Sequence, residues 1–286
     1  MQKPVHDANI NLDDLFVKEN FPKRDNKSHK GSFGRTLLVA GSKQYPGAAL
    51  LASKGASTIG SGLTSLSSRR EVFEQITTAI PEVTHVDFDL DTILEERKKS
   101  TVLVIGPGLT TTNDSNHIVC ELVLQADIPI ILDADGINVL VGKKEIIKKA
   151  KKEILLTPHP KELSRLLEIE VDEIVNNKIK VAKNAASELG CTVMIKGSET
   201  VITAKDGKTF ISPFSNSALA KGGTGDVLTG FIGGLVAQGL DLTKAACIAV
   251  YIHGKTAELA TKDKTVFSVL PQDLIMYLPE AIKIYI

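Results

Sequence analysis

Short apolar runs that end in turn-forming residues constrain the fold of this chain more than any other feature. The runs have the length and composition of strands buried on both faces of a sheet, and helix-like segments at 48–60 and 115–125 follow two of them. They lie at 36–40, 102–105, 130–132, 154–156 and 192–195. Strands that alternate with helices indicate βαβ units, so we expect an α/β protein with a parallel sheet and helices on both faces.

Residues suited to ligand binding or catalysis lie in the turns just after these strands. The five turns are Gly41–Ala48, Gly106–Leu109, Asp133–Gly136, Thr157–Pro160 and Lys196–Thr200. In open α/β sheets, ligands bind outside the carboxyl ends of the strands. We therefore expect the five turns to converge on one cleft.

The domain organisation predicted from the sequence is simple. A length of 286 residues fits one or two domains, but no linker rich in Pro, Gly or Ser divides the chain. Residues 1–30 are polar and indicate a leader packed on the surface, whereas residues 31–286 are expected to form a single domain. Its three cysteines lie too far apart for a zinc site or a disulfide framework, which favours a reducing compartment. The start lacks the features of a signal peptide and the longest apolar region, 227–240, is too short to span a bilayer, so we expect a cytoplasmic protein without a membrane partner.

The charge balance excludes one class of partner. The 34 Lys and Arg residues match the 34 Asp and Glu residues in number, so the formal net charge is zero. General affinity for nucleic acid comes from clustered basic residues, and nucleic acid is therefore not an expected partner. The Lys-rich segment 143–153 lacks interleaved aromatic residues and indicates a solvated helix face.

The strongest local signal is the glycine-rich segment 220–230. Three glycines within four residues precede Asp226 and an apolar helical stretch, which describes a loop whose backbone N–H groups can bind an anion at a helix N-terminus. A structural turn is the alternative, and the spacing excludes an ordinary P-loop. The glycines at 230, 233 and 234 lower helix propensity, which favours close packing in the core over approach to a ligand.

Three other turns each allow two interpretations. Lys196–Thr200 offers donors for a phosphate, or it is a hairpin turn before 201–202. His159 lies between two prolines that fix the backbone, so it is either a ligand contact or a structural histidine. The glycines of 41–48 and 106–109 allow a flat substrate to approach the backbone, or they belong to plain connections.

Eight segments in this order resemble the NAD(P)H-hydrate dehydratases, a carbohydrate-kinase-like family related to the C-terminal half of the YjeF proteins. The resemblance runs from about Lys30 to Pro279. Its segments are His29–Gly34, Ala40–Ser42 with Pro46–Ala49, Ile105–Leu109, Asp133–Asp135 with Asn138, Leu156–Pro160, Lys196–Thr200, Gly222–Asp226 and His253–Gly254.

The resemblance implies a three-layer α/β/α ribokinase-like fold with a mostly parallel central sheet. It also implies a hydro-lyase of nicotinamide cofactor repair, an ADP-dependent (S)-NAD(P)H-hydrate dehydratase. Such an enzyme phosphorylates the ring hydroxyl of the S-epimer of hydrated NADH or NADPH at the expense of ADP, or of ATP, and phosphate is then eliminated. Hydroxide is a poor leaving group and phosphate is a good one, which explains the need for the nucleotide.

The resemblance also assigns roles to residues. Asp226 is expected to be the general base and to contact the substrate. The backbone of Gly223, Thr224 and Gly225 is expected to form an anion hole. The substrate pocket is expected to include Ala48, Gly108 and His159. The adenine nucleotide is expected to bind Lys196, Gly197, Ser198, Glu199, Thr200 and Gly225. Mg²⁺ is expected as a cofactor held largely by phosphate and water, with no protein ligand identified.

Two departures from the family pattern affect the expectations. Many bacterial members carry an epimerase domain before the matched region, whereas only about thirty residues precede it here, so we expect a dehydratase alone with a separate epimerase as its functional partner. Lys221 stands where many relatives have Thr, and we expect it to assist phosphoryl transfer electrostatically. Members of this type lead us to expect a homotetramer.

Two other functions compete with this interpretation. A ribokinase-like kinase of a vitamin-precursor alcohol would use the same Gly-Thr-Gly-Asp segment, but the segments at 157–160 and 196–200 favour the dehydratase. A nucleotide-binding regulator without catalysis would be expected to lack Asp226, which is present.

Overall fold

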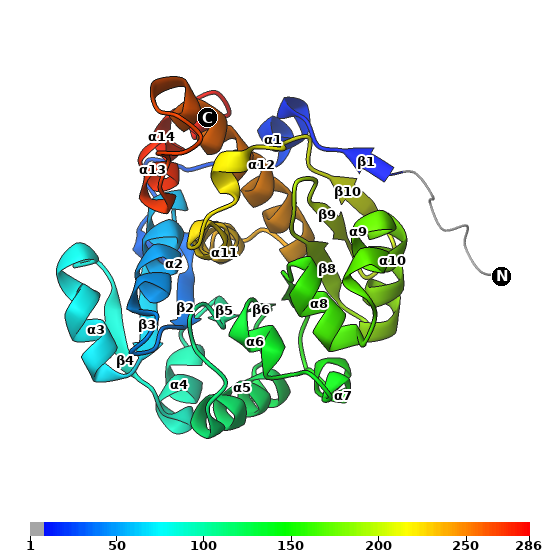
Figure 1. Cartoon of the computed structure of the whole chain (residues 1–286). Helices are drawn as coiled ribbons and strands as arrows, with labels where there is room; N and C mark the ends of the chain where they lie inside the picture. Colours follow the sequence, from blue (N-terminus) through cyan, green and yellow to red (C-terminus); the bar gives the residue numbers. More distant parts are fainter. Residues whose placement is uncertain (1–8) are drawn as a thin grey trace.

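A single mixed sheet organises residues 9–286, the part of the chain that this computed structural model describes. Within those residues the sheet has ten strands in the order β1-β10-β9-β8-β7-β6-β5-β2-β3-β4 (Figure 1). The strands are β1 (Asn9–Asn11), β2 (Arg35–Val39), β3 (Leu63–Ser68), β4 (Thr84–Asp87), β5 (Val102–Ile105), β6 (Ile130–Leu132), β7 (Ile154–Leu156), β8 (Thr192–Ile195), β9 (Val201–Thr203) and β10 (Thr209–Ile211). β9 is antiparallel to β8 and β10, and all other neighbouring pairs are parallel. The predicted mostly parallel sheet is confirmed.

Helices connect the strands and cover the sheet. They are α1 (Asp14–Asn20), α2 (Pro46–Ile59), α3 (Arg70–Ile76), α4 (Leu90–Arg97), α5 (Asn113–Gln125), α6 (Asp135–Asn138), α7 (Lys144–Lys148), α8 (Pro160–Leu167), α9 (Val171–Asn176), α10 (Lys178–Leu189), α11 (Thr224–Ala237), α12 (Leu242–Asp263), α13 (Pro271–Met276) and α14 (Leu278–Ile282). Short 3-10 helices lie at Lys30–Phe33, Thr77–Ala79 and Ser217–Leu219. In residues 9–286 no helix is both long and apolar enough to cross a membrane.

Alternating side chains of the buried strands build two hydrophobic cores, one on each face of the sheet. Leu38 and Val104 belong to the core formed with α2, α11 and α12, whereas Leu37 and Leu103 belong to the core formed with α5 and α10. Figure 1 shows these two groups of helices on opposite faces. The predicted three-layer α/β/α arrangement follows from this alternation, because a strand buried on both faces must be apolar throughout.

The glycines of α11 serve close packing against α2. A Cβ atom at Gly230 would overlap the carbonyl oxygen of Ala52, and one at Gly234 would overlap the side chain of Ile59. Gly233 faces the sheet instead, where an added Cβ would lie 2.8 Å from Val104 Cγ2. The prediction that these glycines serve core packing is confirmed.

The predicted N-terminal leader contributes to the fold. β1 pairs with β10, and the backbone N–H of Leu12 donates to the carbonyl oxygen of Ile211 at 2.9 Å. The side chains of Leu12 and Val17 are buried in the core shared with α11 and α12. Residues 9–20 are therefore not a superficial segment, because they extend the sheet and add apolar side chains to its core. Residues 1–8 of the predicted leader lie outside the described part of the chain.

The chain changes direction across the sheet between β2 and β5. From β2 it runs outward to β3 and β4, and it then returns to β5 on the other side of β2. The chain therefore leaves β2 and β5 in opposite directions along the sheet. The turns that follow these two strands are nevertheless in contact, because Gly41 N donates a hydrogen bond to Pro107 O at 2.8 Å. Such a topological switch point is where open α/β sheets bind their ligands.

Candidate active site

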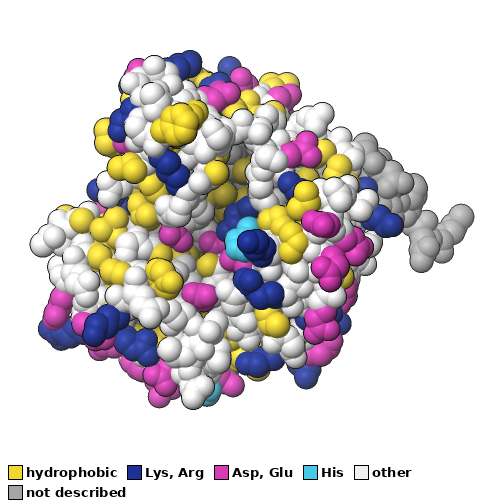
Figure 2. All heavy atoms as spheres, in the orientation of Figure 1, with side chains coloured by type: hydrophobic (Ala, Val, Ile, Leu, Met, Phe, Trp, Pro, Cys, Tyr) yellow, Lys and Arg dark blue, Asp and Glu magenta, His cyan; other side chains and the backbone are white. Residues whose placement is uncertain are grey.

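A pocket lies beside the carboxyl end of β8 and the N-terminus of α11. Its volume is about 380 Å³, and its lining includes Lys196, Gly197, Ser198, Thr200, Thr224 and Gly225. Figure 2 shows a hollow on this face of the molecule, with acidic and basic side chains gathered around it. Six of the residues predicted to hold the nucleotide or an anion are thus brought together.

Lys196–Thr200 forms the predicted hairpin turn, and its binding of phosphate stays a prediction. The segment connects antiparallel strands β8 and β9, so it is a hairpin turn, and four of its residues also line the pocket. Glu199 is the residue of this turn that does not line the pocket, and its carbonyl oxygen accepts a hydrogen bond from the Lys178 ammonium. Binding of nucleotide by Glu199 stays a prediction.

The N-terminus of α11 is held rigidly. Gly223 precedes the helix with φ at 96°, and an added Cβ would lie 2.7 Å from Leu51 Cδ1 and 2.9 Å from Pro271 Cγ. The Thr224 hydroxyl lies 2.7 Å from the Leu219 carbonyl oxygen and 2.9 Å from that of Lys221. The Thr224 backbone N–H donates to Lys221 O at 3.3 Å, so of the three predicted anion-hole amides this one is already engaged. The first N–H groups of a helix otherwise lack partners within it and suit an anion.

His253 contacts the same helix end from α12. Burial lowers its pKa to about 4, so the imidazole is neutral at physiological pH. Its Nε2 lies 3.0 Å from the carbonyl oxygen of Thr224, and the neutral ring donates its proton there. This residue was identified in the sequence without a role, and its contact fixes the first turn of α11.

Asp226 follows directly in the first turn of α11. Burial, together with the negative charge of Asp133, raises the pKa of Asp226 to about 7, while the Lys196 ammonium acts in the opposite direction. A general base works best when its pKa lies near the working pH. The position of Asp226 in the first turn of α11 therefore suits it to remove a proton from a hydroxyl.

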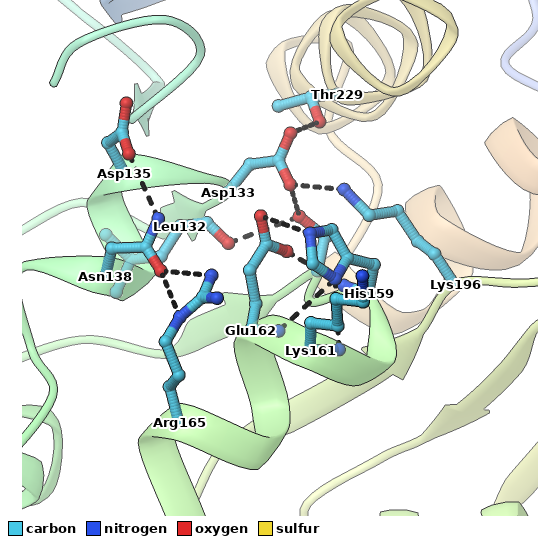
Figure 3. Close-up of polar contacts among 11 residues, drawn as sticks. Leu132, Asp133, Asp135, Asn138, His159, Lys161, Glu162, Arg165, Lys196 and Thr229 are labelled. Atoms are coloured by element: carbon cyan, nitrogen blue, oxygen red, sulfur yellow. Dashed lines mark hydrogen bonds and ion pairs between the residues drawn. The ribbon is translucent and has the colours of Figure 1, made fainter. Parts of the chain in front are cut away.

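Asp133 joins the elements around this helix end (Figure 3). Its buried carboxylate accepts hydrogen bonds from Lys196 Nζ at 2.5 Å, Thr157 Oγ1 at 2.9 Å and Thr229 Oγ1 at 2.7 Å. Asp133, Thr157 and Thr229 all lie within sequence motifs, but none of the three had a role predicted from the sequence. An acidic residue directly after a fully apolar strand was the available signal for Asp133.

His159 has a structural function that the structure shows directly. Its Nδ1 accepts the backbone N–H groups of Lys161 and Glu162 at 3.1 and 3.2 Å, while Glu162 Oε2 accepts the N–H of His159 at 2.8 Å. His159 thus caps α8, and its exposed ring lies in the region of Figure 3 that also contains Asp133 and Lys196. Burial lowers the pKa of His159, with Lys196 adding to the effect, so the ring is neutral. Its contact with substrate stays a prediction.

Ala48 and Gly108 lie against each other at the switch point. Gly108 has φ at 62°, and an added Cβ would lie 2.7 Å from the Cβ of Ala48. Ala48 lies in the first turn of α2 and Gly108 in the turn after β5, so the structure brings these two residues of the predicted substrate pocket into contact.

The side chain of Lys221 is engaged away from the predicted anion hole. Its ammonium donates to the carbonyl oxygens of Phe267 and Val269 at 2.5 and 2.6 Å. The ammonium therefore ties the glycine-rich loop to the segment before α13, which argues against the expected electrostatic assistance to phosphoryl transfer.

The residues around the pocket are compatible with a metal ion that is held mainly by the phosphates of a bound nucleotide. No group of three or more His, Cys, Asp or Glu side chains within residues 9–286 is arranged to hold a metal ion. The carboxylate of Asp133 is already occupied by three side-chain donors. Mg²⁺ keeps several waters and commonly binds through substrate phosphates, so the site fits an ion held mainly by a nucleotide.

Gly254 gives a test of the pocket wall. A Cβ atom there would overlap the ring of Phe214, which packs edge-on against Tyr251 at 4.8 Å between ring centroids. We expect Gly254→Ala to displace Phe214 and so to change the shape of the pocket wall, which should weaken ADP binding by about tenfold, or about 1.4 kcal/mol of binding free energy. Isothermal titration calorimetry measures this change. Adding Phe214→Leu in the same chain should restore part of the affinity, and unchanged ADP binding in Gly254→Ala would contradict the assignment of this wall.

Fold and site together define a class of protein. The first residues of α11 and the Lys196 side chain line one pocket on a doubly wound sheet, and Asp226 follows in the same helical turn, as expected of a ribokinase-like α/β enzyme. The sequence model of the NAD(P)H-hydrate dehydratase family matches residues 36–280, and the chain belongs to that family. The resemblance read from eight sequence segments is confirmed.

Known proteins agree with this assignment. The chain is 38% identical over 271 residues to the ADP-dependent (S)-NAD(P)H-hydrate dehydratase of Bacillus subtilis, and the match covers 93% of this chain and 95% of that protein. A crystal structure of the ADP/ATP-dependent NAD(P)H-hydrate dehydratase of Bacillus subtilis, co-crystallised with ATP and Mg²⁺, has a TM-score of 0.84 at 37% identity and covers 94% of this chain and 96% of its own. The predicted fold class is confirmed by this similarity.

Some relatives are longer than this chain. The bifunctional NAD(P)H-hydrate repair enzyme Nnr of Thermofilum pendens is 32% identical over 273 residues, which cover 92% of this chain and 52% of that protein. The chain thus spans about half the length of such bifunctional relatives.

Proposed function

We propose that this protein removes water from the S-epimer of hydrated NADH or NADPH and uses ADP, or ATP, to do so. The observation that carries the proposal is Asp226, a base with a pKa of about 7 at the N-terminus of α11 and next to the pocket residue Gly225. Membership of the NAD(P)H-hydrate dehydratase family supports the substrate. With ADP the products are NAD(P)H, AMP and inorganic phosphate.

The reaction has two steps. In the first step Asp226 takes the proton of the ring hydroxyl, and the hydroxyl oxygen forms a bond to the terminal phosphorus of ADP while the bond from that phosphorus to AMP breaks. In the second step phosphate leaves with the electron pair of the C–O bond, and the adjacent ring carbon loses a proton to restore the double bond. Water is thereby removed in the form of phosphate and protons.

The other predicted site residues contribute binding or charge. Backbone amides of Gly223 and Gly225 stabilise charge on the transferred phosphoryl group, and such stabilisation is usually the largest single contribution to the rate of phosphoryl transfer. The hairpin turn Lys196–Thr200 binds the nucleotide, and Ala48, Gly108 and His159 hold the hydrated nicotinamide. Mg²⁺, when bound with the nucleotide, neutralises phosphate charge.

Recovery of the reduced cofactor tests this function. Hydrated NADH is incubated with the protein, ADP and Mg²⁺, and the absorbance of reduced nicotinamide is followed, with a parallel assay using ATP. We expect absorbance to recover in a nucleotide-dependent manner. No recovery with either nucleotide, together with phosphorylation of a vitamin-precursor alcohol, would replace this function with that of a kinase, and nucleotide binding without any turnover would indicate a regulator.

Assembly and cellular context follow from the same proposal. An epimerase would convert the R-epimer into the substrate, and the bifunctional NAD(P)H-hydrate repair enzymes among the relatives support this partnership. A homotetramer and a cytoplasmic location are proposed from the family resemblance, and light scattering on the purified protein measures the first of these.

The proposal predicts a definite pH dependence. Burial raises the pKa of Asp226 to about 7, and a general base must be deprotonated to act. We expect kcat/KM to fall as the pH decreases below about 7, with a slope of one proton. A profile that stays flat to the ordinary range of an exposed carboxyl would show that Asp226 is not the titrating base.

A further inference from the structure

The side chain of Lys196 is held in place by a residue outside its own turn. Lys196 follows the last residue of β8, and its ammonium lies 2.5 Å from Asp133 Oδ1. A Cβ atom placed on Gly225 would be 3.5 Å from the same ammonium, so the charge lies against the first turn of α11. The lysine side chain is 18% exposed, which leaves it open to the pocket that it lines.

Asp133 meets partners from three further elements (Figure 3). Lys196 comes from the end of β8, Thr157 from the end of β7 and Thr229 from the second turn of α11, and Asp133 itself follows β6. The Asp133 side chain is 2% exposed. Its two oxygens are therefore fixed relative to the helix that carries Asp226.

A buried ion pair is a poor choice if stability is its sole purpose. Removing two charges from water costs several kcal/mol, and apolar residues of similar volume often serve as well or better. The pair between Asp133 and Lys196 is instead placed where the anion-binding helix end begins. This location indicates a role in the chemistry of the pocket.

We propose that Asp133 is a positioning residue that holds the Lys196 ammonium at the N-terminus of α11, where the ammonium contacts the phosphoryl group during its transfer. The inference rests on the proposed function. Lys196 forms and breaks no covalent bond in the transfer and keeps its proton. Its positive charge balances the charge that moves from the hydroxyl oxygen to the phosphate oxygens and the departing AMP.

The charges around Asp226 make this role measurable. Asp133 at the end of β6, Asp135 in α6 and Glu162 in α8 raise the pKa of Asp226, whereas Lys196 lowers it, and the neutral His253 faces the same turn from α12. Removing the charge of Asp133 therefore shifts the acid limb of the kcat/KM profile to lower pH. Removing the charge of Lys196 shifts it to higher pH.

Asp133→Asn keeps the shape of the side chain and removes its charge. We expect kcat to fall by about a hundredfold, as when one preorganised donor to the transition state is lost, with a smaller change in the KM for ADP. The acid limb should move to lower pH. Lys196→Met should lower kcat by a similar factor and move the acid limb in the opposite direction, and the double variant should lose little more than either single variant because the two residues act as a unit.

Asp273→Asn is the matched control. Asp273 is also buried, and it also accepts a hydrogen bond from a lysine, Lys264 Nζ, at 2.6 Å. Asp273 is not among the charges that chiefly shift the pKa of Asp226. The control is expected to lower the thermal midpoint without moving the acid limb.

The outcomes separate this inference from the proposed function. An inactive wild-type protein with both nucleotides would overturn the function itself. If the wild type is active, a folded Asp133→Asn variant with unchanged kcat would overturn the inference. A folded Asp133→Asn variant with a low kcat but an acid limb that does not move, as in the control, would also overturn it. If Asp133→Asn does not fold, Lys196→Met provides the test. A reduced kcat with an acid limb moved to higher pH supports the inference, and an acid limb that does not move overturns it.

Discussion

Asp226→Asn is expected to lower kcat by about a thousandfold, since a positioned general base typically contributes two to four orders of magnitude. The amide has nearly the same shape as the carboxylate but takes up no proton at neutral pH. Affinity for ADP should stay the same or increase, because the variant removes a negative charge from the helix end that faces the phosphates. Single-turnover assays with hydrated NADH and calorimetry with ADP measure the two effects separately.

Asp241→Asn gives the matched control for this variant. Asp241 also lies at the start of a helix, where its Oδ1 accepts the backbone N–H of Lys244 at 2.8 Å, and asparagine caps helices equally well. The activity of the Asp241→Asn variant should equal that of the wild type. Were Asp226→Asn to keep a tenth or more of the wild-type kcat, about two orders above the expectation, another group would have to be the base.

Gly106→Ala is expected to be the most damaging small substitution in the turns around the site. Gly106 has φ at 127°, and an added Cβ would overlap the carbonyl oxygen of Asp133 and lie 2.5 Å from Gly136 N. Backbone atoms cannot move aside as a flexible side chain can. We expect a loss of about 4 kcal/mol in the free energy of unfolding, at the upper end of single substitutions. Urea denaturation followed by circular dichroism measures it.

Gly142→Ala separates backbone strain from collision. Gly142 also has a positive φ, at 73°, but an added Cβ there meets nothing within 4 Å. The control should lose only about 1 kcal/mol, the usual cost of a left-handed conformation for alanine. Similar losses in the two variants would show that the turn after β5 can shift, in which case Asp133 is held less firmly than its contacts suggest.

The central strands could be predicted because their environment is uniform. β5, β6, β7 and β8 have the residue ranges that were predicted, since strands buried on both faces consist of unbroken apolar residues. β3, Leu63–Ser68, has a polar sequence and was not predicted. Its buried serines are satisfied by tertiary partners, such as Ser65 Oγ with Glu96 Oε1 at 3.0 Å and Ser67 Oγ with Asp87 O at 3.1 Å. Such partners lie elsewhere in the chain, so a local pattern cannot show them.

The candidate site also has parts that could be predicted from the sequence and parts that could not. Gly223–Asp226 and Lys196–Thr200 are contiguous segments whose composition indicates anion binding. The network around Asp133 joins residues from four elements, and Thr229 enters it only because one side of α11 faces the end of β6. The rotation of a buried helix depends on its packing against neighbours, which for α11 involves the glycines that face α2. His159 shows the reverse case, because its capping of α8 is a local feature of the sequence.

The pairing of β1 has a consequence for the order in which the protein folds. Asn9 pairs with Thr209, so the first described strand leaves the ribosome long before its partner β10 has been synthesised. Contacts between distant parts of a chain form late, because the intervening loop must first be closed. The outer edge of β10 is thus exposed to strands of other molecules until residues 9–11 return to cover it.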